Sequence, residues 1–128
     1  MPESSPRSFL DIPADAQATL ISGARDASPV SGLTHKFYKY PARFSPVFAR
    51  AAIDVFTQQG DLCLDPYVGG GTTLVEALAA GRNAIGIDIS ELAHFVSLAK
   101  TAIFDDFDFR RIRSRGCRPA TRRVKVDL

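Results

Sequence analysis

Residues 62 to 73 read Leu-Cys-Leu-Asp-Pro-Tyr-Val-Gly-Gly-Gly-Thr-Thr, and Ala-Ile-Gly-Ile-Asp follows at 84 to 88. The apolar run 62–64 is typical of a short buried strand, which brings Asp65 to its carboxyl end before Pro66 stops further pairing. Three successive glycines then allow a tight turn and a close approach of the backbone to a ligand, which any Cβ would obstruct. We therefore expect a strand that ends in a ligand-binding glycine loop.

A helix is predicted directly after the loop, because Thr72 or Thr73 can cap it and apolar residues recur at helical spacing beyond them. Gly81 is suited to ending this helix in a left-handed conformation. Residues 84–87 predict a second buried strand, which ends on Asp88. In open α/β sheets this order of strand, glycine loop, helix, strand and acid binds a ribose-bearing ligand.

The residues around the loop distinguish three classes of ligand. A triphosphate-binding loop needs a Lys after its last glycine, but Gly71 is followed by two threonines. A dinucleotide fold wants a glycine where Leu74 stands, and it would place the Asp65 carboxylate beside a pyrophosphate. S-adenosylmethionine carries an ammonium and a sulfonium that attract Asp65, and its ribose diol suits Asp88. The sequence therefore favours S-adenosylmethionine.

Residues 65–73 resemble the cofactor motif of the DNA amino-methyltransferases, which methylate the exocyclic amine of adenine or cytosine. The family motif usually has Phe where Tyr67 stands and a small residue, often Ser, where Gly70 stands. Residues 34–44, Thr-His-Lys-Phe-Tyr-Lys-Tyr-Pro-Ala-Arg-Phe, look like the family segment that precedes the loop and closes over the methionine part of the cofactor. Residues 86–93 look like the acid-bearing strand and the helix after it.

The resemblance covers roughly residues 32 to 102 and implies an α/β chain with a partial Rossmann-like class I methyltransferase fold, its sheet truncated. It implies S-adenosylmethionine as cofactor and double-stranded DNA with a flipped base as substrate, as in restriction–modification systems. In the family arrangement Asp65 faces the methionine ammonium, Asp88 holds the ribose hydroxyls and Tyr67 packs at the cofactor edge. The cofactor-binding residues carried over are Asp65, Pro66, Tyr67, Gly69, Gly70, Gly71, Thr72, Asp88, His35, Lys36 and Tyr40.

The family holds the target amine with a further motif, in which an Asp, Asn or Ser precedes Pro-Pro and an aromatic residue. All eight prolines of this chain are isolated, so no catalytic residue is assigned and enzymatic activity stays open. In family members with this motif order the missing motif lies downstream, where this sequence ends at Leu128. Three alternatives follow: a cofactor-binding half whose catalytic motif lies on a second polypeptide, part of a methyltransferase acting on guanine amines of transfer RNA, or a non-functional remnant.

Length and composition favour a single partial domain, since 128 residues with 45% hydrophobic content can build only a modest core. Cys63 and Cys117 have neither metal-ligand spacing nor a disulfide framework, and no signal or membrane segment is recognisable, so we expect a cytoplasmic protein. His35 has no acidic, Cys or His neighbour at ligand spacing, and His94 sits in the middle of a predicted helix. We expect them at the surface or in packing, and no metal site.

The chain divides into three expected regions: a loose N-terminal arm at 1–31, the cofactor-binding part at 32–104, and a disordered tail at 105–128. Within the second region we expect a helix that Ser45 caps and another from Ser90 to about residue 101, with Lys100 near its end.

The tail opens with an acidic stretch at 105–109, and residues 110–128 then hold seven Arg and one Lys against one Asp. So dense a positive charge can contact nucleic-acid phosphates, or it can be a solvated end.

Overall fold

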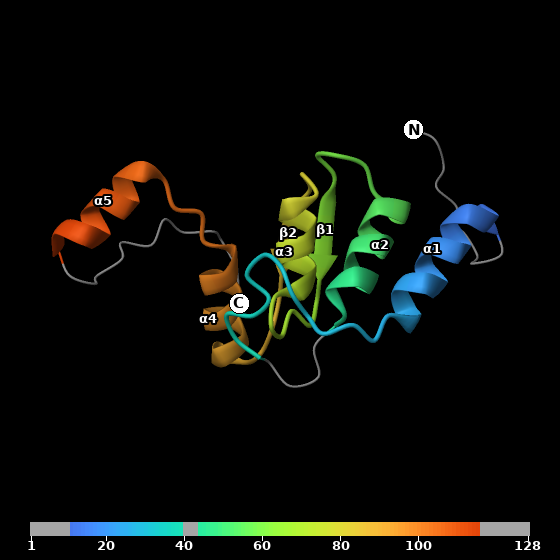
Figure 1. The fold of residues 1–128 in the computed structure, drawn as a ribbon, viewed down its shortest axis with the longest axis horizontal. Coiled ribbons are helices and arrows are strands. Elements are labelled where there is room, and N and C mark those ends of the chain that lie inside the picture. The colour runs from blue at the N-terminus through green and yellow to red at the C-terminus, as the bar shows by residue number, and fades with distance from the viewer. Residues whose placement is uncertain (1–10, 40–43, 116–128) are drawn as a thin grey trace.

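The computed structural model describes residues 11–39 and 44–115 and contains short helices and a small parallel sheet (Figure 1). In chain order the elements are α1 (Ala14–Arg25), α2 (Pro46–Phe56), β1 (Leu62–Asp65), α3 (Thr72–Ala79), β2 (Asn83–Gly86), α4 (Glu91–Thr101) and α5 (Asp106–Arg115). Strands β1 and β2 pair in parallel, with Leu62 opposite Asn83 and Asp65 opposite Gly86. The expected α/β class is confirmed, and the short sheet is consistent with part of a methyltransferase domain.

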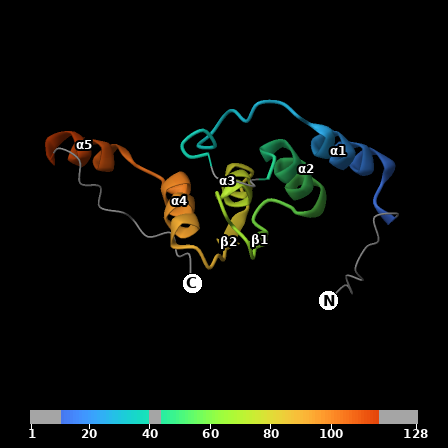
Figure 2. The same cartoon turned by 90° about the horizontal axis from the view of Figure 1, so that it is seen from below.

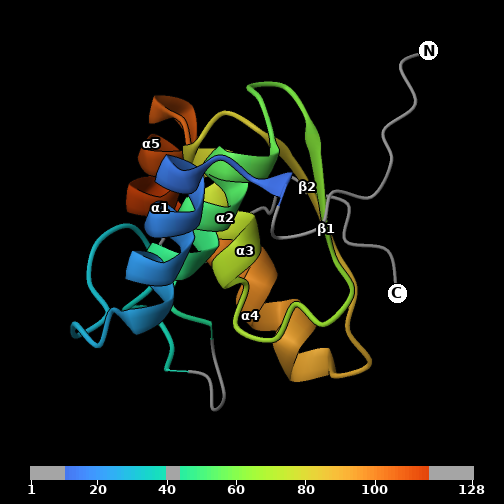
Figure 3. The same ribbon diagram turned by 90° about the vertical axis from the view of Figure 1, so that its right-hand side faces the viewer.

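Helices α2 and α3 lie on one side of the sheet (Figure 3). Helix α3 packs against both strands and α2 packs against α3, so that Ile53, Cys63 and Ala77 form a buried core between them. The opposite face carries four exposed aliphatic side chains, Leu62, Leu64, Ile85 and Ile87. A parallel sheet is normally buried on both faces, so this bare face is unusual for a finished domain.

The helix boundaries follow mostly from local signals. The Ser45 hydroxyl accepts a hydrogen bond from Phe48 N and the Ser90 hydroxyl from Ala93 N, so both predicted caps are confirmed. Gly81 follows α3 with φ +74°, as expected. The expected threonine cap on α3 is wrong, because Gly71 itself occupies the N-cap position with φ +75°.

The expected loose arm is wrong for α1, which packs along α2. Leu20 and Gly23 are the buried residues of this helix. A Cβ on Gly23 would lie 3.2 Å from both Ala51 Cβ and Phe48 Cα, so the glycine lets the two helices approach closely. Tertiary packing thus orders a segment whose own apolar periodicity is weak. Residues 1–10 lie outside the described part of the chain.

Helix α5 forms in the first half of the tail, the region for which the sequence suggests disorder. Asp105 Oδ1 accepts from Asp108 N at 2.8 Å and Asp108 Oδ2 accepts from Asp105 N at 3.2 Å, so the helix start is capped reciprocally. Its acidic first turn and its arginines further on also suit the helix dipole. Helices α1 and α5 lie at opposite ends of the molecule (Figures 1 and 2). Residues 116–128 lie outside the described ranges.

Among the described residues, no helix combines the length and the apolar character that crossing a bilayer requires.

Candidate functional site

The ends of the two strands bring the glycine loop beside the segment that follows β2. Beyond the paired strands, Ile87 N donates to Asp65 O at 2.9 Å and Val68 N donates to Ile87 O at 3.0 Å. These bonds continue the parallel ladder past the strand ends. The chain leaving β1 and the chain leaving β2 therefore stay in contact where ligands bind in open α/β sheets.

Asp88 joins these two segments through its carboxylate. Asp88 Oδ2 accepts a hydrogen bond from Gly69 N at 2.8 Å, and Oδ1 accepts one from Ser90 N at 2.9 Å. The Ser90 N–H and then the Gly69 N–H lower the pKa of Asp88, because they stabilise the charged carboxylate. An ionised carboxylate offers about four acceptor sites. Asp88 therefore fixes the loop and retains acceptor capacity for a ligand hydroxyl.

The loop conformation requires glycine at particular positions. Gly69 has φ +46° and Gly71 has φ +75°, the left-handed region that other residues rarely adopt. A Cβ on Gly71 would also lie 3.1 Å from Ser97 Oγ, and one on Gly86 would lie 2.7 Å from Val68 Cγ2. The loop can therefore sit close to both α4 and β2 only because these side chains are absent.

A small hollow of about 40 Å³ lies between the loop and the start of α3. Its lining residues are Phe44, Asp65, Tyr67, Val68, Gly69, Gly70, Thr72 and Thr73. Five predicted cofactor residues therefore meet at one place. Asp65 Oδ1 accepts from Tyr67 N at 3.0 Å, and the Tyr67 side chain is 87% exposed. Pro66 is exposed beside the hollow, whereas Gly71 lies against α4.

His35, Lys36 and Tyr40 have separate placements. His35 is only 2% exposed, and its Nε2 lies 2.7 Å from Glu76 Oε1. The expectation that His35 is a packing histidine is therefore confirmed, and the fold brings it a carboxylate from 41 residues away. Lys36 is exposed, and Tyr40 lies outside the described residues. The structure brings neither His35 nor Lys36 into the hollow.

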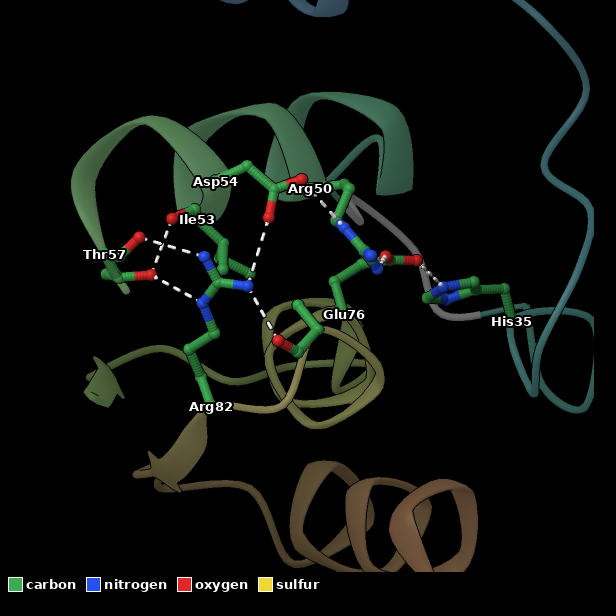
Figure 4. A network of polar contacts seen from close by, with 8 residues as sticks. His35, Arg50, Ile53, Asp54, Thr57, Glu76 and Arg82 are labelled. Atoms are coloured by element: carbon green, nitrogen blue, oxygen red, sulfur yellow. Dashed lines mark hydrogen bonds and ion pairs between the residues drawn. The ribbon is translucent and has the colours of Figure 1, made fainter. Parts of the chain in front are cut away.

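Glu76 belongs to a chain of polar contacts that runs from the turn at 32–38 through α3 and α2 toward β2 (Figure 4). Glu76 Oε2 lies 3.3 Å from Arg50 Nη1, and Arg50 Nε donates to Asp54 Oδ2 at 3.0 Å. Partial burial opposes the charge of Arg50, yet the hydrogen bonds and charges of Asp54 and Glu76 raise its pKa overall. Arg82 continues the chain from Asp54 to Thr57. This network fixes His35 and its turn against α3.

Helix α4 supplies two residues that the sequence pattern missed. Ser97 Oγ donates to Gly69 O at 3.2 Å, and Lys100 Nζ donates to Gly70 O at 2.8 Å. Both side chains are buried. Lys100 was expected only as a favourable charge at the helix end. A buried ammonium within hydrogen-bond distance of a loop carbonyl has no local sequence signal, since 30 residues separate the partners.

The described residues contain no group of three or more His, Cys, Asp or Glu side chains that could hold a metal ion.

Comparison with known proteins identifies a family that this chain matches. The family model described as DNA methylase, of the N6/N4 type, matches residues 21–100. The Type II methyltransferase M.MvaI of Kocuria varians is 40% identical over 72 residues, which cover 54% of this chain and 16% of that protein. The Type II methyltransferase M.MjaII of Methanocaldococcus jannaschii is 32% identical over 78 residues, covering 61% of this chain and 15% of its own length.

A third relative, the Type II methyltransferase M.BsoBI of Geobacillus stearothermophilus, is 38% identical over 72 residues, covering 56% of this chain and 14% of that protein. The matches thus span about a sixth of the length of these relatives. The family match extends over the glycine loop, Asp88 and most of α4. This chain therefore belongs to the DNA methylase family.

Proposed function

We propose that the chain forms the cofactor-binding part of a DNA methyltransferase that transfers a methyl group from S-adenosylmethionine to an exocyclic amino group of adenine or cytosine. The observation that carries the proposal is the placement of Asp65, the glycine loop and Asp88 at the carboxyl ends of two parallel strands. The family match favours DNA over the transfer RNA alternative.

The residues around the loop suit this cofactor chemically. S-adenosylmethionine supplies an activated methyl group on a sulfonium, and its amino acid part carries an ammonium that a carboxylate can bind. Asp65 offers that carboxylate in the hollow, and Asp88 can accept hydrogen bonds from ribose hydroxyls. The bare glycine backbone permits close approach of the ligand.

The described residues can enclose only a small part of S-adenosylmethionine. The hollow of about 40 Å³ is far below the roughly 300–1,000 Å³ typical of small-molecule sites. The rest of the cofactor would be covered by further protein, in keeping with a chain that matches about a sixth of its relatives' length.

A second candidate function is a non-catalytic half of a split methyltransferase, whose catalytic motif lies on another polypeptide. The bare sheet face favours this candidate, because four aliphatic side chains at 62, 64, 85 and 87 are exposed where a parallel sheet is normally covered. Such a partner would supply both the missing cover and the residues that hold a flipped base.

The test is calorimetric titration of the full chain with S-adenosylmethionine and with S-adenosylhomocysteine, its demethylated product. Asp65→Asn should weaken binding about tenfold or more, because it removes the charge that faces the ammonium. Asp61→Asn is a matched control. Asp61 lies just before the same strand at its other end, and each aspartate accepts one local backbone N–H, from Gln58 and from Tyr67 respectively. Saturable binding that both variants retain equally would contradict the assigned role of Asp65, and no binding by a folded wild type would reject the proposed function.

A further inference from the structure

Lys100 lies at the end of α4 and contacts both the glycine loop and the turn at 32–38. Its Nζ donates to Gly70 O at 2.8 Å, and its main-chain oxygen accepts from Thr34 Oγ1 at 2.9 Å. Thr34 belongs to the turn that carries His35, whereas Gly70 is the centre of the loop. One residue of α4 therefore connects two segments that lie 36 positions apart in the sequence.

Burial makes this lysine costly to retain. Only 4% of Lys100 is exposed, and removing an ammonium from water is unfavourable unless hydrogen bonds replace its hydration. A methionine would fill a similar volume without that cost. The hydrogen bond to the loop is thus a specific reason for a charged group at this position.

The contacts from α4 also orient the loop. Ser97 Oγ and Lys100 Nζ hold the carbonyl oxygens of Gly69 and Gly70, so both carbonyls face α4. In a trans peptide the C=O and the following N–H point in opposite directions, so the N–H of Gly70 points away from α4. Gly70 also lines the hollow. Helix α4 therefore binds two acceptors of the loop and leaves the Gly70 N–H directed away from the helix, whereas the Gly69 and Gly71 N–H groups bond within the protein.

We propose that Lys100 is a positioning residue, which orients the glycine loop for the cofactor and ties it to the turn at 32–38. The inference rests on the proposed cofactor site and assigns no contact between Lys100 and the ligand. The ammonium acts on Gly70, whereas the Thr34 bond uses the main-chain oxygen of residue 100 and does not depend on the side chain. Removing the ammonium should therefore loosen the loop and weaken binding while the rest of the fold stays intact.

The test compares Lys100→Met with Thr101→Val in the full chain. Thr101 is an equally buried residue of the same helix, and its hydroxyl donates to Ser97 O rather than to the loop. Hydrogen exchange followed by NMR reports the amides of Gly69 and Gly71, which bond to Asp88 and to Val68 O. Calorimetry with S-adenosylhomocysteine reports affinity.

In Lys100→Met we expect the amides of Gly69 and Gly71 to exchange at least about tenfold faster, while the exchange rates of the α2 amides stay unchanged. Binding of S-adenosylhomocysteine should be about ten- to a hundredfold weaker. Thr101→Val should change neither loop exchange nor affinity, even where it lowers the unfolding midpoint. Equal exchange in the two variants, or equal acceleration in α2 and in the loop, would overturn the inference.

Thr34→Val tests the second contact and serves if Lys100→Met does not fold. It should weaken binding while leaving the loop amides unchanged, and unaltered affinity would refute the tie between loop and turn. If the wild type binds no S-adenosylhomocysteine, the proposed function fails, whereas loop exchange still decides the role of Lys100.

Discussion

Asp88 combines two tasks that a strand-end carboxylate can perform. It accepts from the backbone of the helix that follows it, at Ser90, and from the glycine loop, at Gly69. The first bond is local and the second spans 19 residues. Asp88 therefore has a structural role in the loop before any ligand binds.

Asp88→Asn should destabilise the chain by about 1–3 kcal/mol at neutral pH, because the amide nitrogen cannot accept from a backbone N–H. The pKa of Asp88 in the folded chain lies below its ordinary value of 3.8. Its stabilising contribution is therefore fully present above that value and is lost as the pH falls through the lowered folded-state pKa. Urea unfolding of both proteins between about pH 7 and about pH 2 measures the difference, which should shrink in acid.

Glu91→Gln is the control, because Glu91 lies in the first turn of the same helix and carries one negative charge. It should change stability by only a few tenths of a kcal/mol, roughly the size of a helix-dipole effect. A difference in the free energy of unfolding between wild type and Asp88→Asn that persists unchanged in acid would refute the hydrogen bonds assigned to the Asp88 carboxylate.

At the scale of elements, the buried Glu76 carboxylate connects α3 to α2 and to the turn that holds His35 (Figure 4). The network joins segments that no single local signal relates. Its inner members are buried and its outer members, Arg50 and Asp54, are partly exposed. The two ends of the network should therefore differ in energetic importance.

Glu76→Ala should lower the free energy of unfolding by about 3–5 kcal/mol, because the buried His35 side chain loses its partner and Arg50 keeps only Asp54. Asp54→Asn, at the exposed arm of the same network, should cost no more than about 1 kcal/mol. Urea unfolding followed by circular dichroism measures both. Similar small losses in the two variants would contradict the buried network.

Helix α1 gives a second prediction at this scale. Leu20 is 7% exposed and the adjacent Ile21 is 41% exposed. Leu20→Ala should destabilise the chain by about 2–4 kcal/mol, because it leaves a cavity at a buried position, whereas Ile21→Ala should cost much less. Thermal unfolding of the two variants distinguishes a docked helix from a loose arm, for which both costs would be small and equal.

At the scale of the whole molecule, one sheet face is covered by helices and the other is bare (Figure 3). Exposed contiguous aliphatic side chains and open strand edges favour association. The asymmetry arises because helices pack on only one of the two faces of the sheet.

The purified chain should therefore self-associate, and Leu64→Thr combined with Ile85→Thr should shift it toward the monomer with its helix content unchanged. Sedimentation velocity measures the distribution. Val47→Thr on α2 is the control, because Val47 is also about half exposed but lies away from the sheet. A wild type that is monomeric at all concentrations would show that the bare face does not drive association.

The sequence by itself determined the features that depend on neighbours in the chain. Strand, glycine loop, helix and second strand follow from apolar runs and from three successive glycines, and the caps at Ser45 and Ser90 follow from local hydrogen bonding. Family membership rests on the same contiguous motif. These signals are readable because each involves residues a few positions apart.

Only the tertiary structure decided which distant groups meet. His35 pairs with Glu76 although 41 residues separate them, and Lys100 bonds to Gly70 across 30 residues. Packing on α2 likewise orders α1, whose own sequence pattern is weak. These pairings depend on burial, because a polar group without a partner costs free energy only once the fold has removed it from water.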